Sequence, residues 1–68
     1  MADYNFETEK REAIEAGERA LGSLRKAKQN LDNVFADWMV QDRINKARGQ
    51  IEELIGRVEN ILYQLRSL

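Results

Sequence analysis

Paired carboxylates are the side chains in this sequence whose type and spacing come nearest to catalytic chemistry. Glu52 and Glu53 are adjacent, and Glu12 and Glu15 are three residues apart. General acid–base catalysis at neutral pH usually relies on His, or on a carboxylate or Lys whose pKa burial has moved. The chain contains no His, and these carboxylates belong to the polar faces of the helices that the rest of the sequence predicts. We therefore expect no catalytic residue and no enzyme activity.

The sequence also lacks the residues that usually bind metals and cofactors. With no Cys and no His, the chain cannot form the usual zinc or transition-metal sites. Helical di-metal sites also normally use a Glu-x-x-His motif. The four Gly residues are isolated from one another, so no glycine-rich loop could hold a phosphate group. We expect no metal, no cofactor and no small-molecule substrate.

Basic residues gather in the middle of the chain, where they could contact the phosphate backbone of RNA or DNA. They are Arg19, Arg25, Lys26, Lys28, Arg43, Lys46 and Arg48. Residues 1–18 hold six acids and two bases, so a hairpin would have an acidic open end and a basic band near its turn. The band has a second interpretation: if two hairpins pack with opposite polarity, the acidic end of each lies beside the basic band of the other. No aromatic residues are interleaved with the basic residues to stack nucleotides, which favours this second interpretation.

Helices must position all of these groups. The chain has no Pro and abundant Ala, Glu, Lys, Arg, Leu and Gln, a composition typical of long helices. In the first half, apolar residues recur every seven positions in two lines that together form one seam. The lines are Phe6, Ala13, Ala20, Ala27 and Val34, and Gly17, Leu24, Leu31 and Trp38. Because one line is mostly Ala, a facing helix could approach closely, as in the alanine-rich antiparallel packing called an Alacoil.

The second half carries a wider apolar stripe. Its two heptad lines are Ile44, Ile51, Val58 and Leu65, and Val40, Ala47, Leu54, Ile61 and Leu68. Ile55 and Leu62 add a third column, which is more than a single partner helix would cover. The second helix is therefore expected to touch more than one neighbour, which predicts a bundle of four helices.

The two seams are out of phase, because the first continues from Trp38 to residue 45 whereas the second is centred on Ile44. This break predicts a reversal of the chain, which we place at residues 39–42. Helix one then covers about residues 5–38 and helix two about residues 42–67, with caps at the residues that begin each range, Asn5 and Asp42.

Two alternatives to this turn remain open. A turn at Asp32-Asn33 has better turn chemistry, because both residue types tolerate left-handed backbone and bond their own main chain. One unbroken helix is favoured by the absence of Gly between Ser23 and Arg48, although the phase break argues against it.

The aromatic stretch near the predicted reversal has two interpretations. Phe35 and Trp38 could cap the end of the hairpin core, with Met39 filling gaps. Alternatively, Phe35, Trp38 and Met39 could protrude as an anchor for a partner, since Trp is enriched among residues that dominate binding energy. The exposure of Trp38 distinguishes the two.

The small size of the chain predicts self-association. A chain of 68 residues is a marginal monomer, and without disulfides or a metal self-association is the remaining route to stability. We expect one all-α domain over residues 1–68: a two-helix antiparallel hairpin that self-associates, most simply as a dimer, into a four-helix bundle. The expected seam residues are Ala13, Gly17, Ala20, Leu24, Ala27, Leu31, Ile44, Ile51, Leu54, Val58, Ile61 and Leu65. Apolar runs of three residues or fewer predict no membrane segment, and the absence of Cys favours the cytoplasm.

A short acidic hairpin with an Ala-rich heptad seam resembles the small plasmid proteins that dimerise into four-helix bundles and hold RNA loops together. That resemblance implies a dimeric bundle and RNA as a partner, with no residue carried over. A central Trp between two helices is similar to the secreted hairpins with a Trp-x-Gly turn, but this chain has Trp38-Met39-Val40 and lacks that glycine.

The function expected from these patterns is that of a non-enzymatic helical interaction or scaffold module whose first partner is its own copy. A small dimeric regulator that binds nucleic acid through the basic band is the alternative. A second alternative is a subunit whose wide second helix is completed by a different helical protein.

Overall fold

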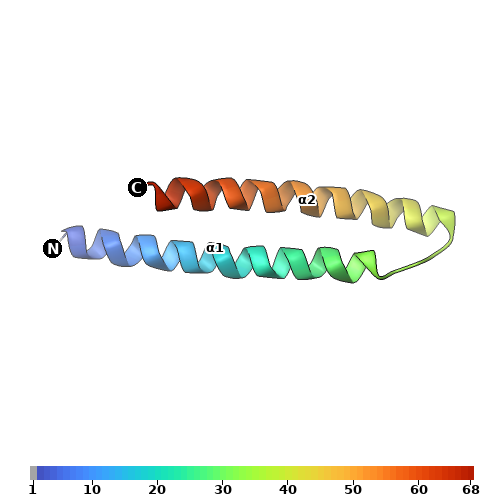
Figure 1. Ribbon diagram of the computed structural model, residues 1–68, viewed down its shortest axis with the longest axis horizontal. Helices are drawn as coiled ribbons and strands as arrows, with labels where there is room; N and C mark the ends of the chain where they lie inside the picture. Colours follow the sequence, from blue (N-terminus) through green and yellow to red (C-terminus); the bar gives the residue numbers. More distant parts are fainter. Residues whose placement is uncertain (1) are drawn as a thin grey trace.

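The fold is a hairpin of two long antiparallel helices (Figure 1). The computed structural model describes the backbone of residues 2–68 and the side chains of residues 5–68. Helix α1 spans Ala2–Asp32 and helix α2 spans Trp38–Arg66, and no strand occurs within these residues. The all-α hairpin expected from the sequence is confirmed, and the alternative of one unbroken helix is wrong.

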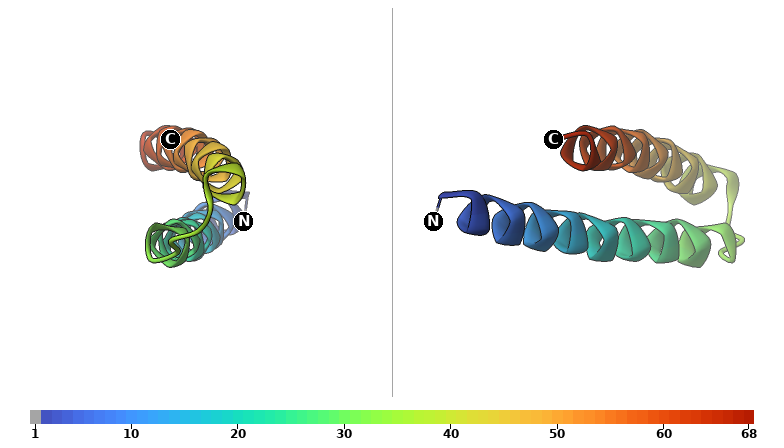
Figure 2. Two further views of the ribbon diagram at one scale, coloured as in Figure 1. Left: turned by 90° about the vertical axis from the view of Figure 1, so that its right-hand side faces the viewer. Right: turned by 60° about the vertical axis from the view of Figure 1, so that its left-hand side comes forward.

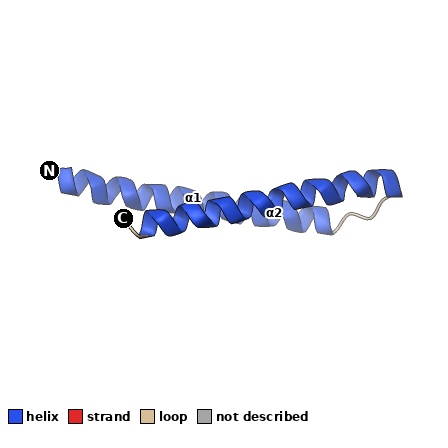
Figure 3. Ribbon diagram, turned by 90° about the horizontal axis from the view of Figure 1, so that it is seen from above, coloured by secondary structure: helices blue, strands red, loops and turns tan. Residues whose placement is uncertain are grey.

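The hairpin is a thin rod of 58 × 15 × 11 Å. The left view of Figure 2 looks along the rod and shows the two helices as two layers, and Figure 3 shows that they cross at a shallow angle. The radius of gyration is 16.4 Å, whereas a compact domain of 68 residues would have about 11 Å. Each helix therefore contacts a single neighbour, and most of its circumference faces outward.

The chain reverses at residues 33–37, so our placement of the turn at residues 39–42 is wrong. Asn5 and Asp42, the expected caps, both lie inside helices, and helix one ends at Asp32 rather than residue 38. The rival turn at Asp32-Asn33 gave the better position. Its left-handed backbone is not used, however, because no described residue other than Gly has a positive φ.

Side-chain and main-chain hydrogen bonds hold the turn together. The last turn of α1 tightens, since the amide of Val34 donates to the carbonyl of Leu31 over 3.1 Å. At the start of α2, the amide of Ala36 donates to Gln41 Oε1 over 3.2 Å, and the amide of Gln41 donates to the carbonyl of Asp37 over 2.7 Å. Gln41 thus satisfies a free amide before the helix, as a side chain in the first turn of a capping box does. Asp37 stands at the N-cap position without a side-chain cap bond.

The two helices meet along one stripe of each. On α1 the stripe repeats at alternating intervals of three and four residues, and on α2 it does the same. Its buried or half-buried members are Ile14, Gly17, Leu21, Leu24, Lys28 and Leu31 on α1, and Gln41, Ile44, Arg48, Ile51, Ile55, Val58, Leu62 and Leu65 on α2. Only Leu21 and Leu62 are buried among the described side chains, with Leu62 2% exposed. The best-packed part of the contact therefore lies around these two leucines, where Leu62 packs against Gly17.

One edge of this contact is lined by ion pairs. Arg25 Nη2 donates to Glu59 Oε2 over 2.9 Å, and Arg66 Nη2 donates to Glu18 Oε2 over 3.2 Å. Lys28 Nζ lies 3.2 Å from Glu52 Oε1. Exposed pairs of this kind contribute about 0–1 kcal/mol each, so they set the register of the helices more than they stabilise the hairpin.

The helices are staggered along the rod. Arg48 Nε lies 2.6 Å from Asp32 Oδ1, an ion pair without hydrogen-bond alignment, since Arg48 Nε has no hydrogen-bond partner. The last residue of α1 therefore sits beside the eleventh residue of α2. At about 1.5 Å per residue, the start of α2 extends roughly 15 Å beyond the end of α1. Figure 1 shows this extension, with the connecting loop running outward to meet it.

Candidate interaction surface

The edge of the hairpin opposite the ion pairs is apolar, and it is the candidate functional surface. On each helix one heptad column lies just outside the helix contact, on the side away from the pairs formed by Glu18, Arg25, Glu59 and Arg66. The column of α1, continued into the loop, is Phe6, Ala13, Ala20, Ala27 and Val34, and the column of α2 is Val40, Ala47, Leu54, Ile61 and Leu68. We call these ten residues the apolar face.

The two columns lie on the same side of the molecule. At the open end a shallow groove on this face is lined by Phe6 and Ala13 of α1 together with Leu65 and Leu68 of α2. Because the register of the hairpin is fixed along its length by the ion pairs of the other edge, the rest of each column follows the same side. The apolar face therefore runs over both helices from the open end to the turn.

The large side chains of the apolar face are exposed. Leu54 is 46% exposed and Ile61 53% exposed, and Phe6, Val34, Val40 and Leu68 are also exposed. Single exposed apolar residues are ordinary, but contiguous apolar patches on a monomer are small, and larger ones mark interaction sites. The exposed apolar residues of this face follow two heptad columns and are not scattered singly over the surface.

The expected seam residues divide between the hairpin contact and this face. Ala13, Ala20, Leu54 and Ile61 are exposed on the apolar face. Ala27 also belongs to the apolar face but is half-buried, and the remaining seven are half-buried in the contact between the helices: Gly17, Leu24, Leu31, Ile44, Ile51, Val58 and Leu65. The pairing of α1 and α2 also uses Ile14 and Leu21, which belong to neither heptad line of the first half, and Ile55 and Leu62, which form the third column of the second half. The apolar stripe of α2 is three columns wide, and this width indicates the surplus. Two of its columns contact α1, and the column that contains Leu54 and Ile61 does not.

The basic band expected near the turn is interrupted by carboxylates. Arg25, Lys28 and Arg48 pair across the hairpin with Glu59, Glu52 and Asp32, and Lys46 Nζ lies 3.1 Å from Asp42 Oδ2 along α2. Within the described side chains no ion pair involves Arg19, Lys26 or Arg43. The seven residues are also distributed around both helices, since consecutive positions such as 25 and 26 point about 100° apart. The structure does not join them into one surface.

The aromatic residues at the turn do not cap the core. Phe35 is 91% exposed in the loop and Trp38, the first residue of α2, is 80% exposed. Met39 is exposed beside it. The interpretation that Phe35 and Trp38 close the end of the hairpin is wrong, because α1 ends before it can reach them. Their exposure is the arrangement that the anchor interpretation requires.

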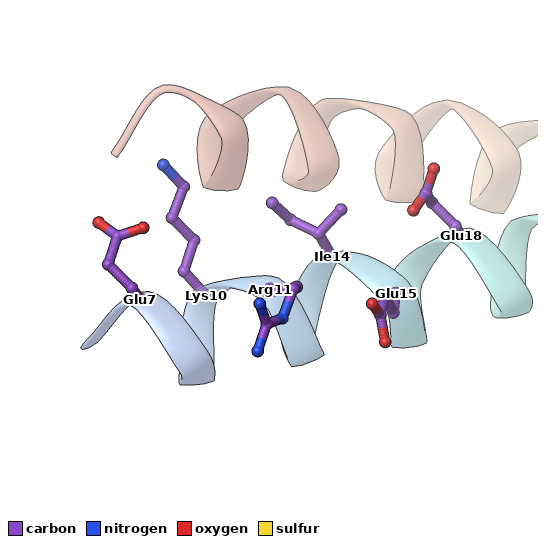
Figure 4. A pocket seen from close by; sticks show the side chains of 6 residues that line it. All are labelled: Glu7, Lys10, Arg11, Ile14, Glu15 and Glu18. Carbon is purple, nitrogen blue, oxygen red and sulfur yellow. The ribbon is translucent and has the colours of Figure 1, made fainter. Parts of the chain in front are cut away.

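A second groove lies along α1 near the open end (Figure 4). It is lined by charged side chains and Ile14, with Lys10 and Ile14 directed toward α2, and Arg11 and Glu15 directed away from it. Lys10 Nζ donates to the carbonyl of Leu68 over 3.3 Å. Its lining comes from α1 alone, and no group of metal-ligating residues occurs among the described residues. We assign this groove no ligand.

Comparison of the chain with protein-family models, with curated proteins and with solved structures finds no match. Among the described residues, neither helix combines the length and the apolar character that crossing a membrane requires.

Proposed function

We propose that this protein is a non-enzymatic helical interaction module whose apolar face binds the same face of a second copy, forming a four-helix bundle. The observation that carries the proposal is the heptad column of α2 that α1 does not cover, in which Leu54 and Ile61 are about half exposed. Its neighbour across the face is a column of alanines, over which another helix can pack closely.

The exposed area of the hairpin supports the proposal. The chain exposes 5559 Å², whereas a compact monomer of 7.9 kDa exposes about 4,400 Å². The excess is roughly 1,100 Å² per chain. Covering it in two copies would bury roughly 2,200 Å² in total, which falls in the range of stable homodimer interfaces. The hairpin thus has the surplus surface that one dimer contact would remove.

The choice of a second copy as the occupant follows from the shape and charge of the face. A two-fold interface places the same patch of both chains in contact, so the patch must be self-complementary. When two hairpins face each other with their turns at opposite ends, α1 packs on α1 and α2 on α2. Leu54 then lies beside Ile61 of the second copy, Ala47 beside Leu68, and Ala20 beside Ala27, so each of these contacts joins apolar side chains. No charged residue interrupts either column.

Sedimentation equilibrium over a wide concentration range, with circular dichroism on the same samples, tests the proposal. We expect a dimer whose helix content falls as dilution dissociates it, because two buried leucines cannot hold the hairpin alone. The double variant Leu54→Asp, Ile61→Asp should be monomeric, since it places two charges in the interface without touching the hairpin contact. The matched control Asn60→Asp adds a charge beside Ile61 on the outer surface and should remain dimeric.

Three results decide the matter. A monomer at every concentration would refute self-association and leave the face for a different helical chain. A double variant that keeps the mass of the wild type would show that the dimer uses another surface. A double variant that becomes monomeric, with the control unchanged, would support the apolar face as the contact.

A further inference from the structure

The turn end of the hairpin contains a notch that the chain itself does not fill. Nearly three turns at the start of α2 extend past the end of α1, so no helix of the same chain lies beside them. Val40, on the apolar face at this level, is 53% exposed, and Val34 in the loop is 41% exposed. The notch is bounded by the extended start of α2, by the loop and by the last turn of α1.

We propose that Phe6 of a second copy fills this notch and packs against Val34 and Val40, so that the two hairpins lie with their turns at opposite ends. The inference rests on the self-association proposed above and adds its direction and its end contact. Phe6 belongs to the same apolar face and is 44% exposed in its own hairpin, near the open end.

The stagger of the helices brings Phe6 of one copy and Val40 of the other to the same level along the rod. The pairings of Asp32 with Arg48 and of Lys28 with Glu52 fix which residues of α1 and α2 lie opposite each other. The centre of the shared register then lies near residues 23 and 24 on α1 and near residues 57 and 58 on α2. Phe6 and Val40 are each about 17 residues from that centre, in opposite directions along the rod. A two-fold axis through the centre, perpendicular to the rod, therefore brings Phe6 of one copy to the level of Val40 of the other.

The distribution of charge along the hairpin favours packing with the turns at opposite ends over parallel packing. The open half of the hairpin, residues 1–23 and 58–68, holds seven acids and four bases, a formal charge of −3. The turn half, residues 24–57, holds five acids and seven bases, a formal charge of +2. Opposite halves meet when the turns lie at opposite ends, whereas parallel packing sets the acidic residues around Phe6 against their own copies. Close contacts matter most here, because salt screens charges beyond about 10 Å.

Disulfide trapping tests the inference directly, because the chain has no Cys of its own. The single variants Phe6→Cys and Val40→Cys are mixed, oxidised gently and separated by mass. A disulfide needs Cβ atoms within about 4.5 Å, so only neighbours in the assembly react efficiently. We expect the mixed product in several-fold excess over either product of one variant with itself. Lys26→Cys, an exposed position outside the apolar face, should give no efficient crosslink.

The outcomes separate this inference from the proposed function. A dimer whose Phe6→Cys chains crosslink mainly to each other would establish parallel packing and overturn the inference alone. Absence of any dimer would overturn both. If Phe6→Cys weakens the dimer, the pair Ala20→Cys and Ala27→Cys tests the direction with small changes: a mixed product supports opposite polarity, and its absence from a confirmed dimer contradicts it.

Discussion

The side chain of Leu62 occupies the space that a Cβ atom on Gly17 would need. Such an atom would lie 2.6 Å from Leu62 Cδ2 and 3.3 Å from Leu62 Cγ, while Leu62 is the most buried of the described side chains. The glycine inside α1 therefore lets the best-packed residue of α2 lie against the backbone of α1. The other glycines have open space where a Cβ would stand.

Replacing Gly17 by Ala should destabilise the protein relative to the same change at Gly22. Both changes gain about 1 kcal/mol of helix propensity, but at Gly17 the new methyl group must displace Leu62, and overpacking costs about 1–3 kcal/mol. Urea unfolding followed by circular dichroism, at one protein concentration for all variants, measures the difference. Equal midpoints for Gly17→Ala and Gly22→Ala would show that the close approach carries no energetic weight.

Replacing Leu62 by Ala should cost about 2–5 kcal/mol, because it opens a cavity in the best-packed part of the hairpin. Adding Gly17→Ala to that variant should recover part of the loss, since the new methyl group enters the vacated space. Residues in contact give non-additive changes, so the double-mutant cycle should show a coupling of about 0.5–3 kcal/mol. Additive changes would mean that the two positions do not share a packing site.

The hairpin could be predicted from the sequence because both heptad patterns run for several repeats, but its turn could not. A turn at residues 39–42 keeps Trp38 in phase with the first seam, whereas the structure leaves Trp38 80% exposed at the start of α2. Local chemistry prevailed: Asp32 and Asn33 are poor helix formers, and Gln41 satisfies a free amide just before α2. The hydrophobic pattern alone cannot distinguish an aromatic residue that is buried from one that is presented.

The apolar face could likewise be predicted only in part from the sequence. The heptad lines contain its residues, and the three-column width of α2 indicates a surplus. Which columns α1 and α2 use for each other depends on the register, and the register is set by contacts such as Arg25 with Glu59, 34 residues apart in the sequence. Contacts between residues so far apart do not appear as a periodicity in the sequence.

The single tryptophan offers a spectroscopic test of the turn end. We expect the Trp38 fluorescence to be quenched by acrylamide almost as readily as free tryptophan, because its side chain is 80% exposed. Quenching should not change between monomer and dimer concentrations, since Trp38 lies off the apolar face, in the heptad column that Glu52 and Glu59 share. A protected tryptophan at dimer concentrations would place the turn inside the interface and contradict the proposed packing.

Adjacent basic residues distinguish ion pairing from nucleic-acid contact. Arg25→Gln should lower the free energy of unfolding by about 0–1 kcal/mol through loss of its exposed pair with Glu59, and Lys26→Gln, which loses no pair among the described side chains, should change it less. Filter binding with a structured RNA provides the second readout. We expect weak binding that both variants leave unchanged, whereas a matched loss of affinity in both would support a phosphate-binding role.

The position of Trp38 has a consequence for the bundle as a connector. In the proposed dimer, with the turns at opposite ends, two identical clusters of Phe35, Trp38 and Met39 would be exposed, one at each end of a rod whose single hairpin is already 58 Å long. Any ligand of those clusters would meet a bivalent spacer of fixed length, and two modest contacts on such a spacer reinforce each other when their targets are the same distance apart. The two-fold symmetry that buries the apolar face would thus also fix the distance between the two exposed aromatic clusters.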